Sequence, residues 1–146
     1  MHVVYPISQE GKEMNDDWKQ KFEQILADRK QRIKELFAFD MFDEDGYPTE
    51  QALEIVSLWH WDDIPGWFKF IKELWWMPDM LWEEKDEPHD FKKDTTVHRY
   101  YFSTGGWSGN ESIIHAMKKA DMMWHLTWVQ ARRGGHYIFE EYKLEK

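Results

Sequence analysis

Residues that could bind a small anion gather in the last third of the chain. Gly105 and Gly106 lie in a loop that runs into a predicted helix from about Gly109 to Lys119. Glycine lets the backbone approach a ligand closely, and the free amides at a helix N-terminus attract negative charge. Neighbouring arginines could complete a clamp on a phosphate or carboxylate, and Trp107 could stack on a ring. The residues predicted to bind such a ligand are Arg99, Tyr101, Ser103, Gly105, Gly106, Trp107, Ser108, Asn110, His125, Thr127, Arg132, Arg133, His136 and Glu140.

The same loop also has a purely structural interpretation. Ser108 and Glu111 have the spacing of a capping box, in which both side chains bond to backbone amides at the start of a helix. Glu111 would then compete with an anion for those amides. The loop also lacks the Gly-Lys-Ser/Thr ending of a P-loop. A glycine-rich turn before a well-capped helix therefore stays an alternative to the anion site.

The histidines of this region permit enzymatic and metal-site hypotheses, but their spacing supports neither. His125 and Thr127 look like one half of a two-histidine phosphodiesterase site, which needs a second such element to supply both acid and base. His98, His115 and His136 are not followed by Ser or Thr two residues later. These histidines have no recognised metal-ligand spacing, with or without Glu140, and no nucleophile elbow is present. We therefore predict no catalytic residue, no metal ligand and no cofactor.

Three stretches near the loop are predicted to be strands, at residues 96–103, 122–132 and 136–142. A two-residue turn at Gly134-Gly135 would pair Arg133 with His136 and determine which side chains share a face. The core face is predicted to hold Tyr100, Phe102, Trp124, Leu126, Trp128, Tyr137 and Phe139. The polar face is predicted to hold Arg99, Tyr101, Ser103, His125, Thr127, His136 and Glu140.

The first half of the chain is predicted to be helical. Apolar residues recur at helical spacing from about residue 15 to residue 37, with Asn15 as the N-cap. Thr49 is predicted to cap a second helix that ends near Trp59. Pro65 should lie in the first turn of a third helix, which ends before Pro78.

The order of these elements predicts an α+β fold, with three N-terminal helices followed by a β-α-β-β unit that forms a small antiparallel sheet. Residues 79–95 are acidic, show no clean period and are predicted to form a surface loop that could cover the C-terminal site. We expect a single domain over residues 1–146, with a mainly helical part at 1–78 and the β-α-β-β part at 96–146.

Composition limits the classes of partner. The chain has 28 acidic residues against 19 Lys and Arg, a formal charge of −9, which argues against broad nucleic-acid binding. An acidic face could meet a basic partner, or could serve solubility alone. Ten Trp, nine Phe and six Tyr are enough for some rings to stay exposed as binding anchors. With no cysteine, no signal-peptide pattern and no apolar run long enough to cross a membrane, we expect a soluble, cytoplasmic protein.

Several blocks of the sequence resemble a group of uncharacterised small proteins encoded by bacteriophages and bacterial genomes. The blocks are STGGWSGNE at 103–111, WHLTW at 124–128 and RRGGHYIFE at 132–140, with two further blocks at 45–49 and 74–76. The resemblance covers roughly residues 43–141 and leaves out the first predicted helix. The group has no established activity, so the resemblance implies no catalytic residue. It implies a context, that of a phage-type accessory protein acting in the host cytoplasm, for which interference with host defence is the expected role.

Two kinds of function follow from these patterns. The first is non-enzymatic binding of a small anionic or nucleotide-like ligand at the predicted site. The alternative is a protein–protein inhibitor that covers a host factor with an acidic, aromatic-rich surface. A phosphodiesterase-like enzyme is the least supported of the three.

Overall fold

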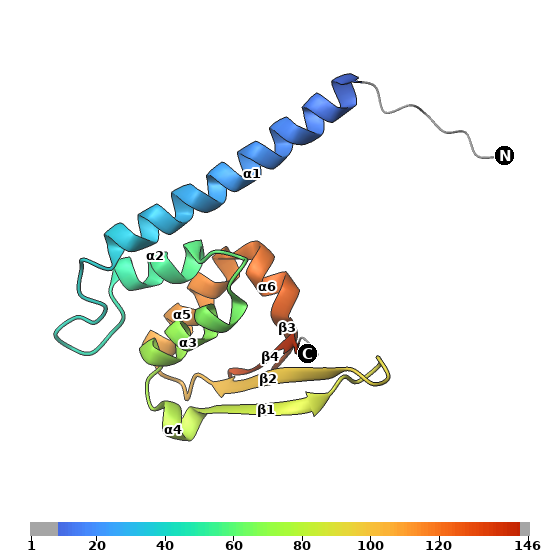
Figure 1. The fold of residues 1–146 in the computed structure, drawn as a ribbon. Coiled ribbons are helices and arrows are strands. Elements are labelled where there is room, and N and C mark those ends of the chain that lie inside the picture. The colour runs from blue at the N-terminus through green and yellow to red at the C-terminus, as the bar shows by residue number, and fades with distance from the viewer. Residues whose placement is uncertain (1–8, 144–146) are drawn as a thin grey trace.

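The computed structural model describes residues 9–143 and confirms the predicted α+β class (Figure 1). Four antiparallel strands in the order β1-β2-β4-β3 form one sheet, and α2, α3, α5 and α6 lie over one side of it, here called the inner face. The side facing away from these helices is the outer face. The helices are α1 Gln9–Leu36, α2 Glu50–Leu58, α3 Ile64–Leu74, α4 Pro78–Leu81, α5 Ser108–Lys119 and α6 Asp121–Thr127. The strands are β1 Trp82–Pro88, β2 Thr96–Ser103, β3 Trp128–Arg132 and β4 His136–Tyr142.

Helix α1 is longer than predicted, and its N-terminal half projects away from the rest of the fold (Figure 1). Because the helix already includes Gln9, Asn15 lies inside it, and the prediction of Asn15 as N-cap was wrong. Of the described side chains of α1, Ile33 and Leu36 are buried, whereas Trp18 is 66% exposed. The apolar stripe therefore contacts the other helices mainly through its C-terminal half.

The start signals of the next two helices are confirmed. The Thr49 hydroxyl accepts a hydrogen bond from the Ala52 amide at 3.2 Å, as an N-cap does. At α3 the Asp63 carboxylate caps the Gly66 amide at 3.0 Å, and Pro65 lies in the first turn as predicted. These caps direct the apolar faces of α2 and α3 into one core.

Aromatic rings join α3 to the central strands. Phe68 of α3 stacks on Tyr100 of β2, with 3.9 Å between ring centroids, and lies 5.7 Å from Phe139 of β4. Phe102 stacks on Trp82 of β1 at 4.1 Å and on Phe139 at 5.1 Å. The predicted core positions Tyr100, Phe102 and Phe139 are therefore confirmed, and each is at most 4% exposed.

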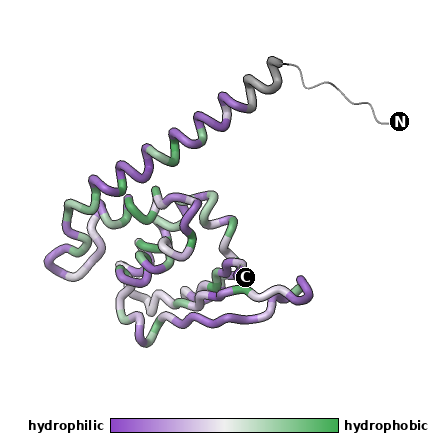
Figure 2. The backbone as a smooth tube through the Cα atoms, in the orientation of Figure 1, coloured by the Kyte–Doolittle hydropathy of each residue, from purple (hydrophilic) through white to green (hydrophobic). Residues whose placement is uncertain are grey.

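Residues 79–95 do not form the predicted loop. They contain most of α4, all of β1 and the connection to β2, and β1 pairs with β2 from Trp82↔Phe102 to Pro88↔Thr96. The strand was missed because its sequence, WEEKDEP, is hydrophilic apart from its ends, as Figure 2 shows along β1. An edge strand of this kind is specified by its partner strand, because its own side chains provide little apolar alternation.

Residues 122–132 do not form one strand. Helix α6 occupies Asp121–Thr127, and β3 begins only at Trp128. Met123 and Thr127 are buried one helical turn apart, and the Thr127 hydroxyl donates to the Met123 carbonyl at 2.6 Å. Trp124, Leu126 and Trp128 alternate in sequence and were all predicted to face the core. Trp124 does pack against the core, with its ring centroid 5.1 Å from that of Phe139. Leu126 is 59% and Trp128 45% exposed, so the prediction is confirmed for Trp124 and wrong for Leu126 and Trp128.

The turn between β3 and β4 has one residue more than predicted. Arg132, rather than Arg133, pairs with His136, so residues 133–135 form the turn. A register shift between Trp128 and Gln130 compensates for the change further along β3. A tight hairpin turn of this kind needs a residue with positive φ, which glycine adopts readily, and both Gly134 (93°) and Gly135 (80°) have it.

This turn gives a stability prediction with a matched control. A Cβ at Gly135 would lie 2.3 Å from the hydroxyl oxygen of Thr104, whereas at Gly134 the nearest atom is 3.4 Å away, in the His136 ring. Gly134→Ala should lower the free energy of unfolding by about 1 kcal/mol through backbone strain alone. Gly135→Ala adds a clash with the buried Thr104 and should lower it by about 2–3 kcal/mol. Urea unfolding measures both values, and equal losses would contradict the close approach to Thr104.

Candidate functional site

The sheet register brings part of the predicted site together on the outer face. Arg99 pairs with Glu140 and Ser103 with His136, as expected for residues that share one face. Two predicted members lie elsewhere because residues 121–127 are helical. His125 is an exposed residue of α6 that faces Asp121 at 3.8 Å, and Thr127 is 1% exposed. These two residues were wrongly placed on the polar face of the sheet.

Arg99 is saturated by three carboxylates. Its Nε donates to Glu140 at 2.9 Å, Nη1 to Glu87 at 2.9 Å, and Nη2 lies 3.1 Å from Asp90. Burial by itself would lower the pKa of Arg99, but the hydrogen bonds to these carboxylates raise it above its ordinary value. The side chain is only 7% exposed. Its observed contacts therefore join β1, β2, β4 and the β1–β2 connection, rather than form an open anion clamp.

The connection between β1 and β2 folds over the outer face next to Arg99. His89 stacks on Tyr142 with ring centroids 5.7 Å apart, and the Lys92 ammonium donates to the Tyr142 hydroxyl at 3.0 Å. The Tyr101 hydroxyl donates to Glu87 at 2.8 Å, and burial raises the pKa of that hydroxyl. The connection thus covers the Arg99 end of the outer face.

Four predicted residues line one small cavity at the other end of the outer face. Tyr101, Ser103, Arg132 and His136 surround about 310 Å³, and the Ser103 hydroxyl and His136 Nδ1 share a hydrogen bond of 2.5 Å. Among the described residues, no carboxylate forms an ion pair with Arg132. This cavity is the part of the predicted anion site that the structure assembles.

The glycine loop before α5 is held by contacts within the protein. Trp107 stacks with Tyr47 at 4.9 Å and with Trp76 at 5.4 Å, so rings of the same chain occupy the place proposed for a ligand. The Asn110 side chain is fully buried and accepts from the Trp76 amide at 2.9 Å. Ser108 is the first helical residue, and Trp107 occupies the N-cap position without a side-chain hydrogen bond, so the predicted capping box was wrong.

These contacts build a surface that the sequence did not predict as a unit. We call it the aromatic end, and it consists of Phe42, Tyr47, Trp76, Met77, Met80 and Trp107. Tyr47 is 38%, Trp76 43% and Met80 74% exposed. Met77 has φ of 51°, a conformation that residues other than glycine seldom adopt and that often marks functional surfaces. The aromatic and methionine residues are visible in the sequence, but they belong to three segments that are far apart in the chain, and only the fold brings them together on one surface.

A second group of side chains was missed because β1 was predicted to be a loop. His98 of β2 lies between Asp86, 2.6 Å from Nδ1, and Glu84, 2.8 Å from Nε2. Lys143 reaches the same Asp86 at 2.6 Å. Burial by itself would lower the pKa of His98, but the hydrogen bonds to Asp86 and Glu84 raise it. With both ring nitrogens hydrogen-bonded to carboxylates, the contacts favour the imidazolium form of His98 and leave no nitrogen free to act as a base.

His98 lies in the largest cleft described here, of about 1020 Å³, between α3 and the His98 end of the inner face. Tyr100 donates to Glu141 in this cleft at 3.1 Å, and burial raises the pKa of both groups. Within the described residues, no group of three or more His, Asp or Glu side chains has an arrangement that could hold a metal ion. The cleft thus contains an ion-pair network around His98 and a hydrogen-bonded Tyr100–Glu141 pair.

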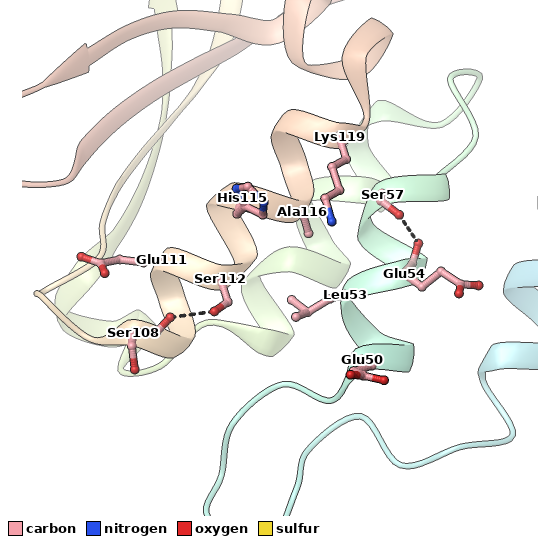
Figure 3. A pocket seen from close by; sticks show the side chains of 10 residues that line it. All are labelled: Glu50, Leu53, Glu54, Ser57, Ser108, Glu111, Ser112, His115, Ala116 and Lys119. Atoms are coloured by element: carbon pink, nitrogen blue, oxygen red, sulfur yellow. Dashed lines mark hydrogen bonds between the residues drawn. The ribbon is translucent and has the colours of Figure 1, made fainter.

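A third cavity, of about 630 Å³, lies between α2 and α5 (Figure 3). Two of its three serine hydroxyls bond to the backbone of their own helices, since Ser57 donates to the Glu54 carbonyl at 2.8 Å and Ser112 to the Ser108 carbonyl at 3.0 Å. His115 and Lys119 of α5 line the same groove as the carboxylates of α2 (Figure 3). This mixture of charges selects no particular class of ligand.

Comparison with known proteins identifies no relative of this chain. No family model, no curated protein and no solved structure matches this chain. Across residues 9–143, no helix is both long enough and apolar enough to span a bilayer.

The Arg99 network predicts a stability defect. Arg99→Ala would leave three carboxylates close together without their cation, so it should lower the free energy of unfolding by about 3 kcal/mol. Arg133→Ala, at an exposed position of the turn, is the matched control and should change it by less than about 0.5 kcal/mol. Denaturant unfolding compares the two variants. A small loss for Arg99→Ala would contradict a structural role for this ion-pair network.

The His98 network predicts a pH dependence of stability. Because the pKa of His98 is raised in the folded state, its contribution is fully present below the unfolded value near 6.5 and is lost as the pH rises through the folded value. The pKa values of Asp86 and Glu84 are lowered, so these two carboxylates change the stability only in a separate, more acidic pH range. Between about pH 6 and pH 9, wild type should lose about 0.5–1 kcal/mol more than His98→Gln. Parallel stability curves for the two proteins would show that His98 does not contribute this way.

Proposed function

We propose that this protein acts by binding another protein through the aromatic end. The observation that supports this most is the convergence of large, partly exposed apolar side chains from three segments on one surface. Aromatic side chains at the centre of an interface supply much of its binding energy. The three ion pairs of Arg99 favour the same proposal, because a small anion would have to displace three carboxylates from the guanidinium group.

The biological setting is part of the proposal. The resemblance of residues 43–141 to phage-encoded proteins suggests a factor of a bacterial host as the partner. In this proposal the protein covers the surface of that factor and thereby inhibits it, and the factor belongs to the defence of the host. This mode of action needs no catalytic group in the inhibiting protein.

Binding of a small anion is the second candidate, and one cavity favours it. Tyr101, Ser103, Arg132 and His136 line the outer-face cavity, and Arg132 projects from an exposed position there. At about 310 Å³ the cavity is at the lower limit of typical ligand pockets, so it suits a phosphate or carboxylate group better than a whole nucleotide.

One experiment separates the two candidates. Immobilised wild-type protein should recover one protein in stoichiometric amount from bacterial host lysate, and Trp76→Ala should reduce recovery at least tenfold, because hot-spot aromatics contribute about 2 kcal/mol or more. Trp18→Ala removes an exposed ring of α1 and is the control, with unchanged recovery expected.

The second arm is calorimetric titration with inorganic phosphate and with mono-, di- and cyclic nucleotides. If one of these binds, if Arg132→Ala weakens it and Arg133→Ala does not, and if no protein is recovered, the small-anion function replaces the proposed one. Circular dichroism must first show that each variant is folded.

A further inference from the structure

We infer that the aromatic end is a docking surface for a cationic segment of a partner protein, which places arginine or lysine side chains around an apolar side chain. This inference rests on the proposed protein-binding function and specifies the chemistry of the partner.

The segments that form the aromatic end carry charge of one sign. The three segments that form it, residues 37–50, 75–82 and 104–112, contain no Lys, Arg or His. They contain seven acidic residues, which are Asp40, Asp43, Glu44, Asp45, Glu50, Asp79 and Glu111. The β3–β4 turn, which reaches this end through the hydrogen bond from the Thr104 amide to the Gly135 carbonyl, brings Arg132 and Arg133. His115, Lys118 and Lys119 of α5 line cavities with Glu50 and Glu111, at the side of the aromatic end that faces α5. With seven acids against these four Lys and Arg, the local balance is negative.

These acids differ from most carboxylates elsewhere in the fold by having no cation. Glu54, Asp62, Glu84, Asp86, Glu87 and Glu140 all form ion pairs within the protein. None of the seven acids at the aromatic end does so among the described residues. A surface that gathers unpaired charge of one sign is complementary to a partner of the opposite sign.

The rings at this surface suit the same partner. Guanidinium and ammonium groups are attracted to the faces of Trp and Tyr rings, and most strongly to Trp. Tyr47, Trp76 and Trp107 stack together and remain partly exposed, so a cation can contact a ring and a carboxylate at once. An apolar side chain of the partner would bury the exposed surface of Met77 and Met80.

The surface is held in place before a partner arrives. Asp43 accepts hydrogen bonds from the amides of Asp45 and Tyr47, both at 2.9 Å, which orders the loop that presents Tyr47. Asn110 binds both the amide and the carbonyl of Trp76. A pre-ordered surface loses less conformational entropy on binding, and this raises affinity.

The charge also argues against other occupants. Nucleic acids and anionic lipid surfaces would be repelled by the seven acids. A second copy of the chain docking through the same surface would place like charges opposite each other. The cationic protein segment is the occupant whose charge and apolar character both match.

The test uses two synthetic peptides of equal length and the full chain. One contains arginine, leucine and glycine, and in the other every arginine is replaced by glutamate. The arginine peptide should bind with an affinity that falls as salt increases, and it should shift the indole NMR signals of Trp76 and Trp107. The glutamate peptide should not bind. Absence of binding by the arginine peptide would overturn the inference.

Matched variants locate the binding. Glu44→Gln, Asp45→Asn and Asp79→Asn together remove three unpaired acids of the aromatic end and should weaken the arginine peptide at least about tenfold. Asp16→Asn, Glu23→Gln and Glu73→Gln together change the net charge equally at exposed positions elsewhere and should leave affinity within about twofold. Equal weakening by both sets would mean that binding follows net charge and would overturn the inference.

The same variants separate this inference from the proposed function. If the aromatic-end triple variant recovers the host protein as well as wild type does, while Trp76→Ala does not, the cationic chemistry of the partner is wrong and protein binding through the aromatic end stands. If the arginine peptide binds at the aromatic end but wild type recovers no protein, the cation-binding surface stands and the proposed function fails.

Discussion

Packing of α3 against the two central strands is the interaction on which the other features depend. Phe68 lies within 3.9 Å of Tyr100 and 5.7 Å of Phe139, measured between ring centroids, and these rings belong to neighbouring strands. Since β1 adds to the edge of β2 through Trp82 and Phe102, the same layer of rings also sets the position of the edge strand. The middle of the inner face is consequently filled by core side chains, and open surface is left on the outer face and at the ends of the fold, including the cleft beside His98.

The ends of the fold differ in how their charges are satisfied. At one end of the sheet, Arg99 and His98 each lie between carboxylates, one on the outer face and one on the inner face. Both cations stabilise contacts between β1 and β2, and their positions leave little charge available for a ligand. At the opposite end, acids and rings gather without a Lys or Arg in the segments that contribute them. This asymmetry is the physical basis for the proposal that the aromatic end binds a partner.

The aromatic end also shows how a structural residue and a binding residue can have the same signature in a sequence. Trp107, next to two glycines and a helix start, has the features expected of a ligand-stacking residue. In the fold it stacks with Tyr47 and Trp76, and Asn110 binds Trp76 from inside. The loop thus serves as the support of a surface built by three segments.

The sequence by itself determined the features that depend on local chemistry. Thr49 and Pro65 specify helix starts through bonds and φ values within one turn, and the positive φ of Gly134 and Gly135 follows from their residue type. The alternation of apolar and polar residues in 96–103 and 136–142 was enough to place Tyr100, Phe102 and Phe139 in the core.

Tertiary contacts decided the remaining features of the fold. Strand β1 exists because β2 supplies its hydrogen-bond partners, and α6 because Met123 and Thr127 bury together against the core. Whether Arg99 meets a ligand or three carboxylates depends on residues 9 to 41 positions away, and no local pattern contains that information.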